Sequence, residues 1–342
     1  MGRPKKKKEI ILSDDSSIIK SELEKLGGKI MNSLDELTPM RFLSTGLFSF
    51  DKIVSDSGGI PGNSVVEIFG PNSTGKTSVA LQIATEAQKE NMKVYYMNAE
   101  RAINSSIVNC FPALDPTKVD WIDPDTGESA IDIMKTIIKT QTDVLVILDS
   151  VPACLPSVMA DASAGDSSVG RLAALFSPFM PEAKKWCREN NNILVLLNQE
   201  RANIGPMARG GKIQPGGHAI KFYTDIRIKL VKRFTNGNIV IGGDTIGHII
   251  EAKAEKTRWA PPHQTADLPL IYGSGFDIGR ELLTAATLYS IVVKKGAWYS
   301  YFRPGEEEVA FKSQGEDKMA AWIRCNIDIQ KEIKQRMSEI LS

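Results

Sequence analysis

Residues 65–77 read VVEIFGPNSTGKT: a short apolar run, a turn bounded by glycines, and the first residues of a helical pattern. The segment from Gly70 to Thr77 fits the pattern G-x-x-x-x-G-K-[ST], which requires a strand before it and a helix after it. In that context backbone N–H groups curl around a phosphate, and the N-terminus of the helix adds positive potential. The stretch therefore predicts a phosphate-binding loop after a buried strand in which only Glu67 is polar.

The residues of this loop and one distant carboxylate have expected parts in the phosphate site. Lys76 is expected to reach the β- and γ-phosphates of a nucleotide, and Thr77 to place its hydroxyl on Mg²⁺. Asp149, which closes the run VLVILD, is either a second Mg²⁺ ligand, directly or through water, or the cap of a helix. The remaining cofactor contacts are expected from Gly70, Pro71, Asn72, Ser73, Thr74 and Gly75.

The chain around the loop alternates apolar runs with helical patterns. Runs at 65–69, 94–98, 144–148 and 193–197 are typical of parallel strands buried on both faces. A helix is expected after an Asp125-x-x-Glu128 capping box, and another over 170–190 that Pro178 and Pro181 should break or kink. Segments 226–234 and 239–243, around TNGN, indicate an antiparallel hairpin. The core is therefore predicted to be α/β, with a mostly parallel central sheet and an antiparallel edge.

Three regions are expected along the chain. Residues 1–40 form an N-terminal arm whose segment 16–26 has the spacing of a short amphipathic helix, suited to docking onto a neighbouring copy. Residues 41–275 form the core. Residues 276–342 form a small α+β domain with a helix, a strand pair around GAWYSYF and two terminal helices.

Composition excludes several classes of protein. At 42% hydrophobic and 24% charged residues with a net charge of +1, the chain is typical of a globular protein without a global cationic field, so any nucleic-acid site must be local. No apolar run reaches the roughly 18 residues of a membrane span, and no signal peptide follows the start MGRPKKKK. The basic start is a solvated arm, a nucleic-acid-seeking arm or a nuclear address. The cysteines lack paired spacing, which favours free thiols in a reducing compartment.

Two strand ends and one long loop are candidate functional elements. Glu100 ends VYYMNAE, where it is either a surface acid or the group that polarises an attacking water. Gln199 ends ILVLLNQ, where its side chain can sense a γ-phosphate and pull the loop that follows. That loop, ERANIGPMARGGKIQPGG (200–217), is long, glycine-rich and basic. Loops of this kind are usually lids, binding loops or disordered.

Taken in this order, these pieces resemble the RecA family of strand-exchange recombinases, in its bacterial or phage-encoded form. The resemblance runs from STGLFSFD (44–51) to the C-terminus and includes NAER (98–101), DPDTGESA (123–130), LVILDSVPA (145–153), LLNQERANIG (196–205), GGHAIKFYTDIR (216–227) and KKGAWYSY (294–301). The phosphate loop is shared by many NTPases, whereas AIKFYTDIR with GAWYSY downstream is specific. The resemblance implies a RecA-like P-loop ATPase core, ATP and Mg²⁺ as cofactors, and a cytoplasmic location in a bacterium or a phage-infected host.

The resemblance also gives roles to residues that the patterns leave open. It implies that Glu100 activates water, that Gln199 couples nucleotide to DNA, and that Lys256 and Arg258 reach the γ-phosphate of a neighbouring subunit. Without it, Lys256 and Arg258 would be a solvated pair at a strand edge. Asn104 is expected near the adenine; with Ile107 it replaces an acid and an aromatic residue, which predicts looser base selectivity and weaker nucleotide affinity.

In this family the loop 200–217 is one of two DNA-binding loops, and the other is expected at about 157–170. The basic side chains would pair with phosphates, the glycine amides would approach the backbone, and apolar side chains would wedge between bases. The expected DNA contacts are Arg171, Arg201, Asn203, Ile204, Met207, Arg209, Lys212, Gly216 and Gly217. The loop 157–170 is acidic, and Val169 and Pro181 depart from the bacterial pattern.

The sequence therefore predicts a DNA-dependent ATPase that forms filaments on single-stranded DNA and exchanges strands with a homologous duplex in recombination and repair. Expected partners are both DNA forms, further copies of the chain in a helical filament, and mediator and single-strand-binding proteins, with no membrane. Two alternatives share the motifs. A hexameric helicase would form closed rings, and the GAWYSY module argues against it. A non-hydrolysing accessory protein would need a disabled site, yet Lys76, Glu100 and Asp149 are intact.

Overall fold

The computed structural model describes residues 23, 25–26, 41–155, 168–202 and 212–341. The chain divides into two units, Met1–Pro39 and Met40–Ser342, and the fold below is that of the second unit. Most of the helix predicted over 16–26 and nearly all of the loop predicted at 157–170 lie outside the described residues. Within the described ranges, no helix is long and apolar enough to cross a membrane.

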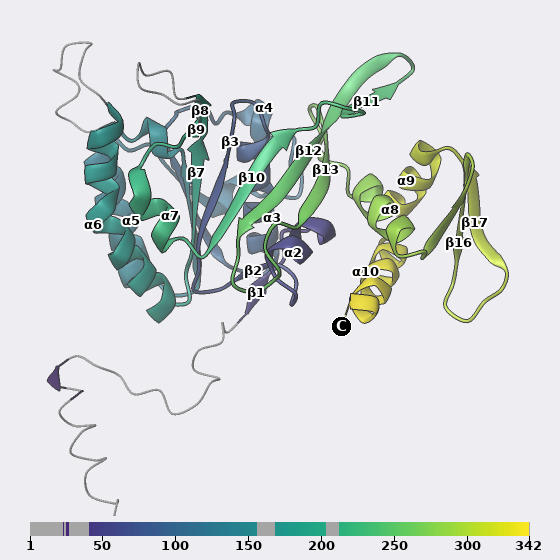
Figure 1. Cartoon of the computed structure of the whole chain (residues 1–342), viewed down its shortest axis with the longest axis horizontal. Helices are drawn as coiled ribbons and strands as arrows, with labels where there is room; N and C mark the ends of the chain where they lie inside the picture. Colours follow the sequence, from purple (N-terminus) through teal and green to yellow (C-terminus); the bar gives the residue numbers. More distant parts are fainter. Residues whose placement is uncertain (1–22, 24, 27–40, 156–167, 203–211, 342) are drawn as a thin grey trace, which may run out of the picture. The chain divides into compact units, whose positions relative to one another are not determined.

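A ten-stranded sheet forms the middle layer, in the order β14-β13-β12-β10-β3-β7-β6-β4-β5, with β11 beside β12 (Figure 1). The strands from β10 to β5 are parallel, and β11 to β14 form an antiparallel edge. The α/β core predicted from the sequence is thus confirmed. The bounds are β3 (Val65–Gly70), β4 (Lys93–Asn98), β5 (Val119–Ile122), β6 (Val144–Asp149), β7 (Ile193–Gln199), β10 (Ile226–Lys232), β11 (Asn238–Ile241), β12 (Asp244–Lys256), β13 (Thr265–Ile271) and β14 (Gly275–Phe276).

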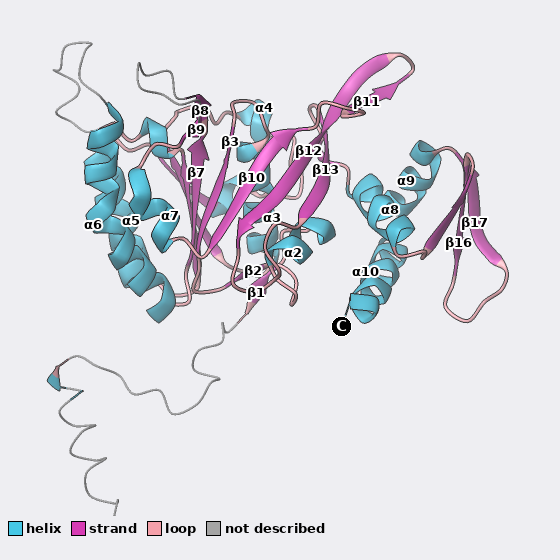
Figure 2. Cartoon of the chain, in the orientation of Figure 1, coloured by secondary structure: helices cyan, strands magenta, loops and turns pink. Residues whose placement is uncertain are grey.

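Helices cover both faces of the sheet (Figures 1 and 2). One face carries α5 (Gly127–Thr140), α6 (Ser168–Glu189) and α7 (Gly217–Tyr223), and the other carries α2 (Phe48–Val54), α3 (Lys76–Lys89) and α4 (Ser105–Val108). Each face has its own apolar core, and the strands β3, β6 and β7 contribute alternate residues to both. This is why these strands appear in the sequence as continuous apolar runs. Two short pairs complete the core: β1 (Phe42–Leu43) with β2 (Ile60–Pro61), and β8 (Arg201–Ala202) with β9 (Lys212–Ile213).

The C-terminal region has a separate apolar core under a three-stranded antiparallel sheet. The sequence predicted only a strand pair around GAWYSYF, and this was wrong by one strand. The missed strand, β17, is mostly exposed, so its residues carry little hydrophobic signal. The elements are α8 (Ile278–Leu288), β15 (Val292–Lys295), β16 (Trp298–Phe302), β17 (Val309–Gln314), α9 (Glu316–Cys325) and α10 (Ile327–Leu341).

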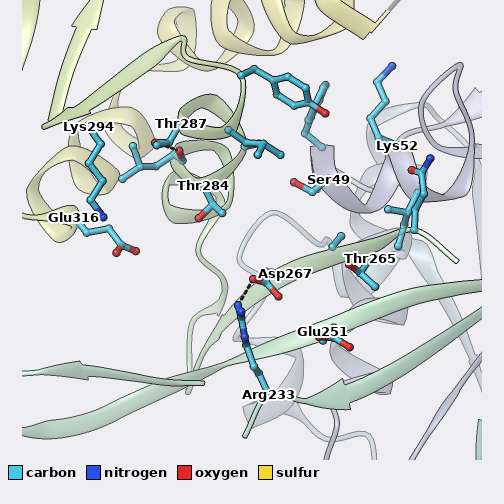
Figure 3. A pocket seen from close by; sticks show the side chains of 18 of the residues that line it. Ser49, Lys52, Arg233, Glu251, Thr265, Asp267, Thr284, Thr287, Lys294 and Glu316 are labelled. Atoms are coloured by element: carbon cyan, nitrogen blue, oxygen red, sulfur yellow. Dashed lines mark hydrogen bonds and ion pairs between the residues drawn. The ribbon is translucent and has the colours of Figure 1, made fainter. Parts of the chain in front are cut away.

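A cleft of about 660 Å³ separates the edge of the central sheet from α8 and the C-terminal strands (Figure 3). On the sheet side Arg233 forms an ion pair with Asp267, and on the other side Lys294 lies near Glu316. At the root of the cleft the two parts are joined, because Glu281 of α8 accepts a hydrogen bond of 2.6 Å from the backbone N–H of Ser49 in α2. Phe48 of α2 also belongs to the C-terminal apolar core.

Two expectations about helices differ from the structure. The capping box of α5 is formed by Thr126 and Ser129, one residue later than predicted, and Asp125 is exposed. The helix α6 runs without a break through Pro178 and Pro181. A proline costs about 3 kcal/mol inside a helix, and here the apolar face of α6, which includes Phe176 and Met180, is fully buried against the sheet and holds the helix together.

The hairpin predicted around TNGN was wrong. The strands β10 and β11 do not pair with each other; both lie along the same side of β12, one after the other. The tight turn is instead at Gly242-Gly243, between β11 and β12, with φ angles of +63° and +96°. Two-residue hairpin turns favour positive φ, which glycine adopts without strain. The sequence did not reveal this arrangement because β12, the strand with which both β10 and β11 pair, comes later in the chain.

Candidate nucleotide and DNA site

The phosphate loop lies between the end of β3 and the start of α3, as predicted. A side chain at Gly70 would place its Cβ 2.2 Å from the carbonyl oxygen of Leu230, so only glycine fits this close approach of two strands. Residues 72–78 line a cleft of about 470 Å³, and the opposite walls are Glu100, Asp149, Gln199, His248 and Leu270. The carboxyl ends of parallel strands thus bring the predicted cleft residues together from four separate segments.

A buried hydroxyl–carboxylate pair lies beside the loop. The Thr77 hydroxyl donates to Asp149 over 2.8 Å, and the Tyr96 hydroxyl donates to the same carboxylate oxygen over 2.8 Å. Burial raises the pKa of Asp149, while these two hydrogen bonds act in the opposite direction. Tyr96 was missed in the sequence, where it appears only as one aromatic residue of an apolar strand.

The donor set at this pair suits Mg²⁺. The ion prefers hard oxygen ligands and keeps several waters, so it is usually held by one or two protein oxygens together with substrate phosphates. Thr77 and Asp149 offer two such oxygens next to the phosphate loop. Within the described residues, no cluster of three or more His, Cys, Asp or Glu forms a cage that would hold a metal by protein alone.

Lys76 begins α3 and turns back over the loop. Its Nζ donates to the carbonyl of Pro71 over 2.8 Å and lies 3.4 Å from that of Gly70. Burial lowers the pKa of Lys76, and the neighbouring carboxylates of Glu100 and Asp149 oppose this effect. The ammonium group therefore lies in the cleft with an anion-binding loop on one side and two acids on the other.

Glu100 and Gln199, predicted separately, are in contact. The Gln199 Nε2 donates to Glu100 Oε1 over 3.2 Å, and the same oxygen accepts a hydrogen bond from the Ser150 hydroxyl. Ser150 was not predicted as a site residue. Gln199 is the last residue of β7, and the backbone N–H of the next residue, Glu200, donates to the carbonyl of Gly70 over 3.0 Å. The N-terminal stem of the loop 200–217 is thus bonded to the phosphate loop.

The predicted DNA contacts are placed only in part. The backbones of Arg201 and Lys212 belong to the short pair β8–β9, which closes the stem of the loop, while Asn203, Ile204, Met207 and Arg209 lie outside the described residues. Gly216 and Gly217 begin α7. A Cβ at Gly217 would meet that of Ala173 at 2.7 Å, so α7 starts against the first turns of α6, close in sequence to Arg171. The C-terminal stems of both predicted DNA loops therefore adjoin.

The structure does not bring Lys256 and Arg258 to the cleft of their own chain. Lys256 is the last residue of β12 and pairs with Arg227 of β10, which in turn pairs with Glu67 of β3. Glu67 lies three residues before Gly70, the first residue of the phosphate loop, so Lys256 lies away from that loop. Its Nζ donates to the carbonyls of Lys221, Phe222 and Thr224 at the C-terminal end of α7, over 3.1, 2.9 and 2.5 Å. Arg258 lies 3.8 Å from Asp225. Burial lowers the pKa of Lys256, and the charge of Arg258 acts in the same direction.

Two further residues stand near the nucleotide cleft. Asn104 caps α4, accepting a hydrogen bond of 3.2 Å from the backbone of Ile107, and is not among the described residues that line the cleft. His248 was not predicted but lines it; its Nδ1 lies 3.2 Å from the Tyr272 hydroxyl. Burial lowers the pKa of His248, with a smaller contribution from Lys232.

A parallel α/β core with a phosphate loop after β3 and a Thr–Asp pair beside it defines a P-loop nucleoside triphosphatase. The chain matches the family models for the RecA N-terminal domain over residues 15–277 and the RecA C-terminal domain over residues 280–342. The chain belongs to the RecA family. It is a RecA-type recombinase and an ATP-hydrolysing enzyme.

Relatives named Protein RecA align along nearly the whole chain. The protein of Sulfurovum sp. is 32% identical over 328 residues, covering 96% of this chain and 90% of its own length. That of Clostridium acetobutylicum is 31% identical over 320 residues, with 94% and 87% covered, and that of Symbiobacterium thermophilum is 30% identical over 328 residues, with 94% and 91% covered. Among solved structures, the RadB recombinase shares the fold, with a TM-score of 0.50 and 18% identity over 68% of this chain and 98% of that one.

Proposed function

We propose that the chain hydrolyses ATP in response to single-stranded DNA, assembles head to tail on that DNA, and exchanges strands with a homologous duplex. The contact between Glu100 and Gln199 carries the proposal, because it joins the cleft to the residue that precedes the loop 200–217. When the side chain of Gln199 exchanges its contact with Glu100 for another partner, the N-terminal stem of the loop moves with it, because Gln199 directly precedes that stem. The helicase and accessory-protein alternatives are not favoured by membership of the RecA family.

Each group in the cleft has a chemical part in this proposal. Lys76 and the loop amides bind the phosphates, whose anionic oxygens replace the carbonyls that Lys76 contacts. Thr77 and Asp149 hold Mg²⁺, which neutralises phosphate charge when bound. The Glu100 carboxylate orients the attacking water as a general base. Ser150 and Gln199 fix the orientation of this carboxylate.

The position of Lys256 and Arg258 supports a site shared between subunits. They lie away from the phosphate loop of their own chain, so they serve a nucleotide only in a neighbouring copy. A head-to-tail interface that does not close generates an open helical filament. On this proposal the chain has three functional parts: residues 1–40 for assembly, 41–275 for ATP and DNA, and 276–342 as an accessory domain.

Further partners follow from the same chemistry. Single-strand-binding proteins occupy the single-stranded DNA that this protein needs. These proteins, and mediators that replace them on the DNA with this protein, are therefore proposed partners. The cytoplasm is the proposed location. All four cysteines are free, as expected in a reducing compartment.

Steady-state ATP hydrolysis with and without single-stranded DNA tests the proposal. We expect stimulation by DNA in the wild type and no turnover in Lys76→Ala. Absence of stimulation in the wild type would contradict the proposed function.

Mixing two inactive variants tests the shared site. In an equal mixture of Lys76→Ala and Lys256→Ala, about a quarter of randomly formed head-to-tail interfaces combine an intact phosphate loop with an intact Lys256. We expect the mixture to regain hydrolysis that neither variant shows alone. No recovery would show that Lys256 does not act across the interface.

A further inference from the structure

A buried polar cluster lies between the nucleotide cleft and the C-terminal stem of the loop 200–217. Its members are Glu67 of β3, Asn198 of β7 and Arg227 of β10. Glu67 and Asn198 have 0% exposure, and the side chain of Arg227 is 12% exposed. Central parallel strands are normally apolar, and burying a carboxylate is costly unless it is paired and hydrogen-bonded. The contacts of Glu67 in the middle of the sheet are therefore candidates for a functional role.

Both oxygens of Glu67 are held by side chains of the neighbouring strands. Asn198 Nδ2 donates to Oε1 over 2.8 Å, and Arg227 Nε donates to Oε2 over 2.6 Å. The guanidinium group is fixed further, because it lies 4.7 Å from the ring centroid of Phe69 and 3.9 Å from the carboxylate of Glu255. Contacts of this number leave the side chains of Asn198 and Arg227 one well-defined orientation.

The same two side chains reach the C-terminal stem of the loop. Asn198 Nδ2 donates to the carbonyl of Pro215 over 3.0 Å, and Arg227 Nη2 donates to the side-chain oxygen of Gln214 over 2.7 Å. Gln214 and Pro215 directly precede Gly216, where α7 is capped. The strand β9 of this stem pairs with β8 of the N-terminal stem, whereas Gln214 and Pro215 lie outside the strands and are attached to the central sheet through the polar cluster.

The cluster also touches the nucleotide side. Asn198 Oδ1 accepts a hydrogen bond of 2.9 Å from the backbone N–H of Gln199, whose side chain contacts Glu100 in the cleft. A single asparagine therefore bonds the backbone of Gln199 with its oxygen and the stem at Pro215 with its nitrogen.

We propose that Asn198, oriented by Glu67 and Arg227, is the positioning residue that transmits the state of the nucleotide cleft to the C-terminal stem of the DNA loop. The inference rests on the proposed function, in which Gln199 responds to the γ-phosphate. A shift of the Gln199 backbone changes the hydrogen bond at Asn198 Oδ1. Because the Nδ2 of the same amide group is bonded to Pro215, the stem follows. The N-terminal stem at Glu200 has its own link to Gly70, so both ends of the loop respond together.

The test measures the affinity for a fluorescent oligothymidylate with and without a non-hydrolysable ATP analogue. The ratio of the two affinities is the coupling factor. In the wild type we expect a factor of about tenfold or more. The variant Asn198→Asp keeps the shape and an acceptor for Gln199 but cannot donate to Glu67 or Pro215. Its coupling factor should fall close to one, while its affinity for a fluorescent ATP analogue should stay within about twofold of the wild type.

Asn192→Asp is the matched control. Asn192 directly precedes the first residue of β7, is also 0% exposed, and donates from Nδ2 to the carbonyls of Ile138 and Gln141 over 3.0 and 2.8 Å. This variant loses donors of the same kind and should lose stability, but it should keep the wild-type coupling factor. The double variant Glu67→Gln with Asn198→Asp restores a donor between the two side chains but not the bond to Pro215. It should regain stability without regaining coupling.

The possible results separate the inference from the proposed function. A wild-type coupling factor in Asn198→Asp overturns the inference and leaves the proposed function intact. An equal loss of coupling in Asn192→Asp also overturns it, because the effect would then be general destabilisation. A wild type without nucleotide-dependent DNA binding overturns both. Loss in Asn198→Asp and in the double variant, with coupling kept in Asn192→Asp, supports the inference.

Discussion

Asp51 offers a quantitative test of how the fold treats a buried carboxylate. It lies on α2 with 7% exposure and accepts hydrogen bonds from the Ser44 hydroxyl over 2.6 Å and from the backbone and hydroxyl of Thr45 over 2.8 and 2.6 Å. Burial raises the pKa of Asp51 from 3.8 to about 6, although these hydrogen bonds favour the charged form. The perturbation is Asp51→Asn, which keeps the shape and removes the titration.

The sign of the effect follows from proton linkage. Since the pKa of Asp51 is higher in the folded state, the folded protein holds a proton that the unfolded chain releases between about pH 4 and pH 6. Wild-type stability therefore gains as the pH falls through this window and loses the gain as the pH rises. A shift of roughly two pKa units corresponds to about 3 kcal/mol in full, and to about 2 kcal/mol between pH 7 and pH 4.5.

The assay is urea unfolding of both proteins at pH 7 and pH 4.5, followed by circular dichroism. The stability of Asp51→Asn relative to the wild type should fall by about 2 kcal/mol between the two pH values. Most other groups titrate alike in both proteins and cancel in the difference. The exception is Glu281, whose pKa is raised by burial and further by the charge of Asp51, so part of its shift disappears with that charge. The same stability difference at both pH values would refute the reasoning.

Two further substitutions test close contacts of the fold. Tyr96→Phe removes the hydroxyl that donates to Asp149 and should lower the free energy of unfolding by about 2 kcal/mol, since hydrogen bonds to charged groups contribute that much. Tyr95→Phe, at the half-buried neighbouring residue, is the control, and equal losses of stability in urea unfolding would show that the hydrogen bond to Asp149 does not stabilise the fold. Gly279→Ala would place a Cβ 2.1 Å from the carbonyl oxygen of Ala320, so α8 and α9 should separate at a cost of about 1–3 kcal/mol; an unchanged urea midpoint would show that the two helices have room.

The sequence predicted those parts of the fold in which burial requires several consecutive apolar residues. The strands β3, β4, β6 and β7 were placed within one or two residues because both of their faces are covered, so the apolar signal is continuous. The phosphate loop was equally clear, because its backbone requires glycine at fixed positions. The same local signal misplaced the hairpin, because TNGN and Gly242-Gly243 both favour a turn and only the pairing with β12 distinguishes them.

The candidate site was predictable where its residues end apolar runs and hidden where its contacts join distant segments. Asp149 and Gln199 each close a buried strand, so their position at the cleft followed from the pattern. Tyr96 looked like one more core aromatic, and its bond to Asp149 spans 53 residues of sequence. Glu67 was visible as an interruption of a strand, but its partner Arg227 is 160 residues away. Which buried polar groups meet is a property of the strand order, and that order is set by tertiary packing.

The helix α7 lies between the two functions that this fold combines. It begins at Gly217, the last residue of the proposed DNA loop, and its C-terminal carbonyls accept three hydrogen bonds from Lys256. An ammonium group has three N–H donors, so these carbonyls occupy all of them. If Lys256 serves the nucleotide of a neighbour, it must give up carbonyls of α7 as it binds phosphate. On the proposed function, the neighbouring nucleotide and the end of α7 would then compete for the charge of Lys256. This competition would couple the nucleotide bound by one subunit to the proposed DNA loop of the next.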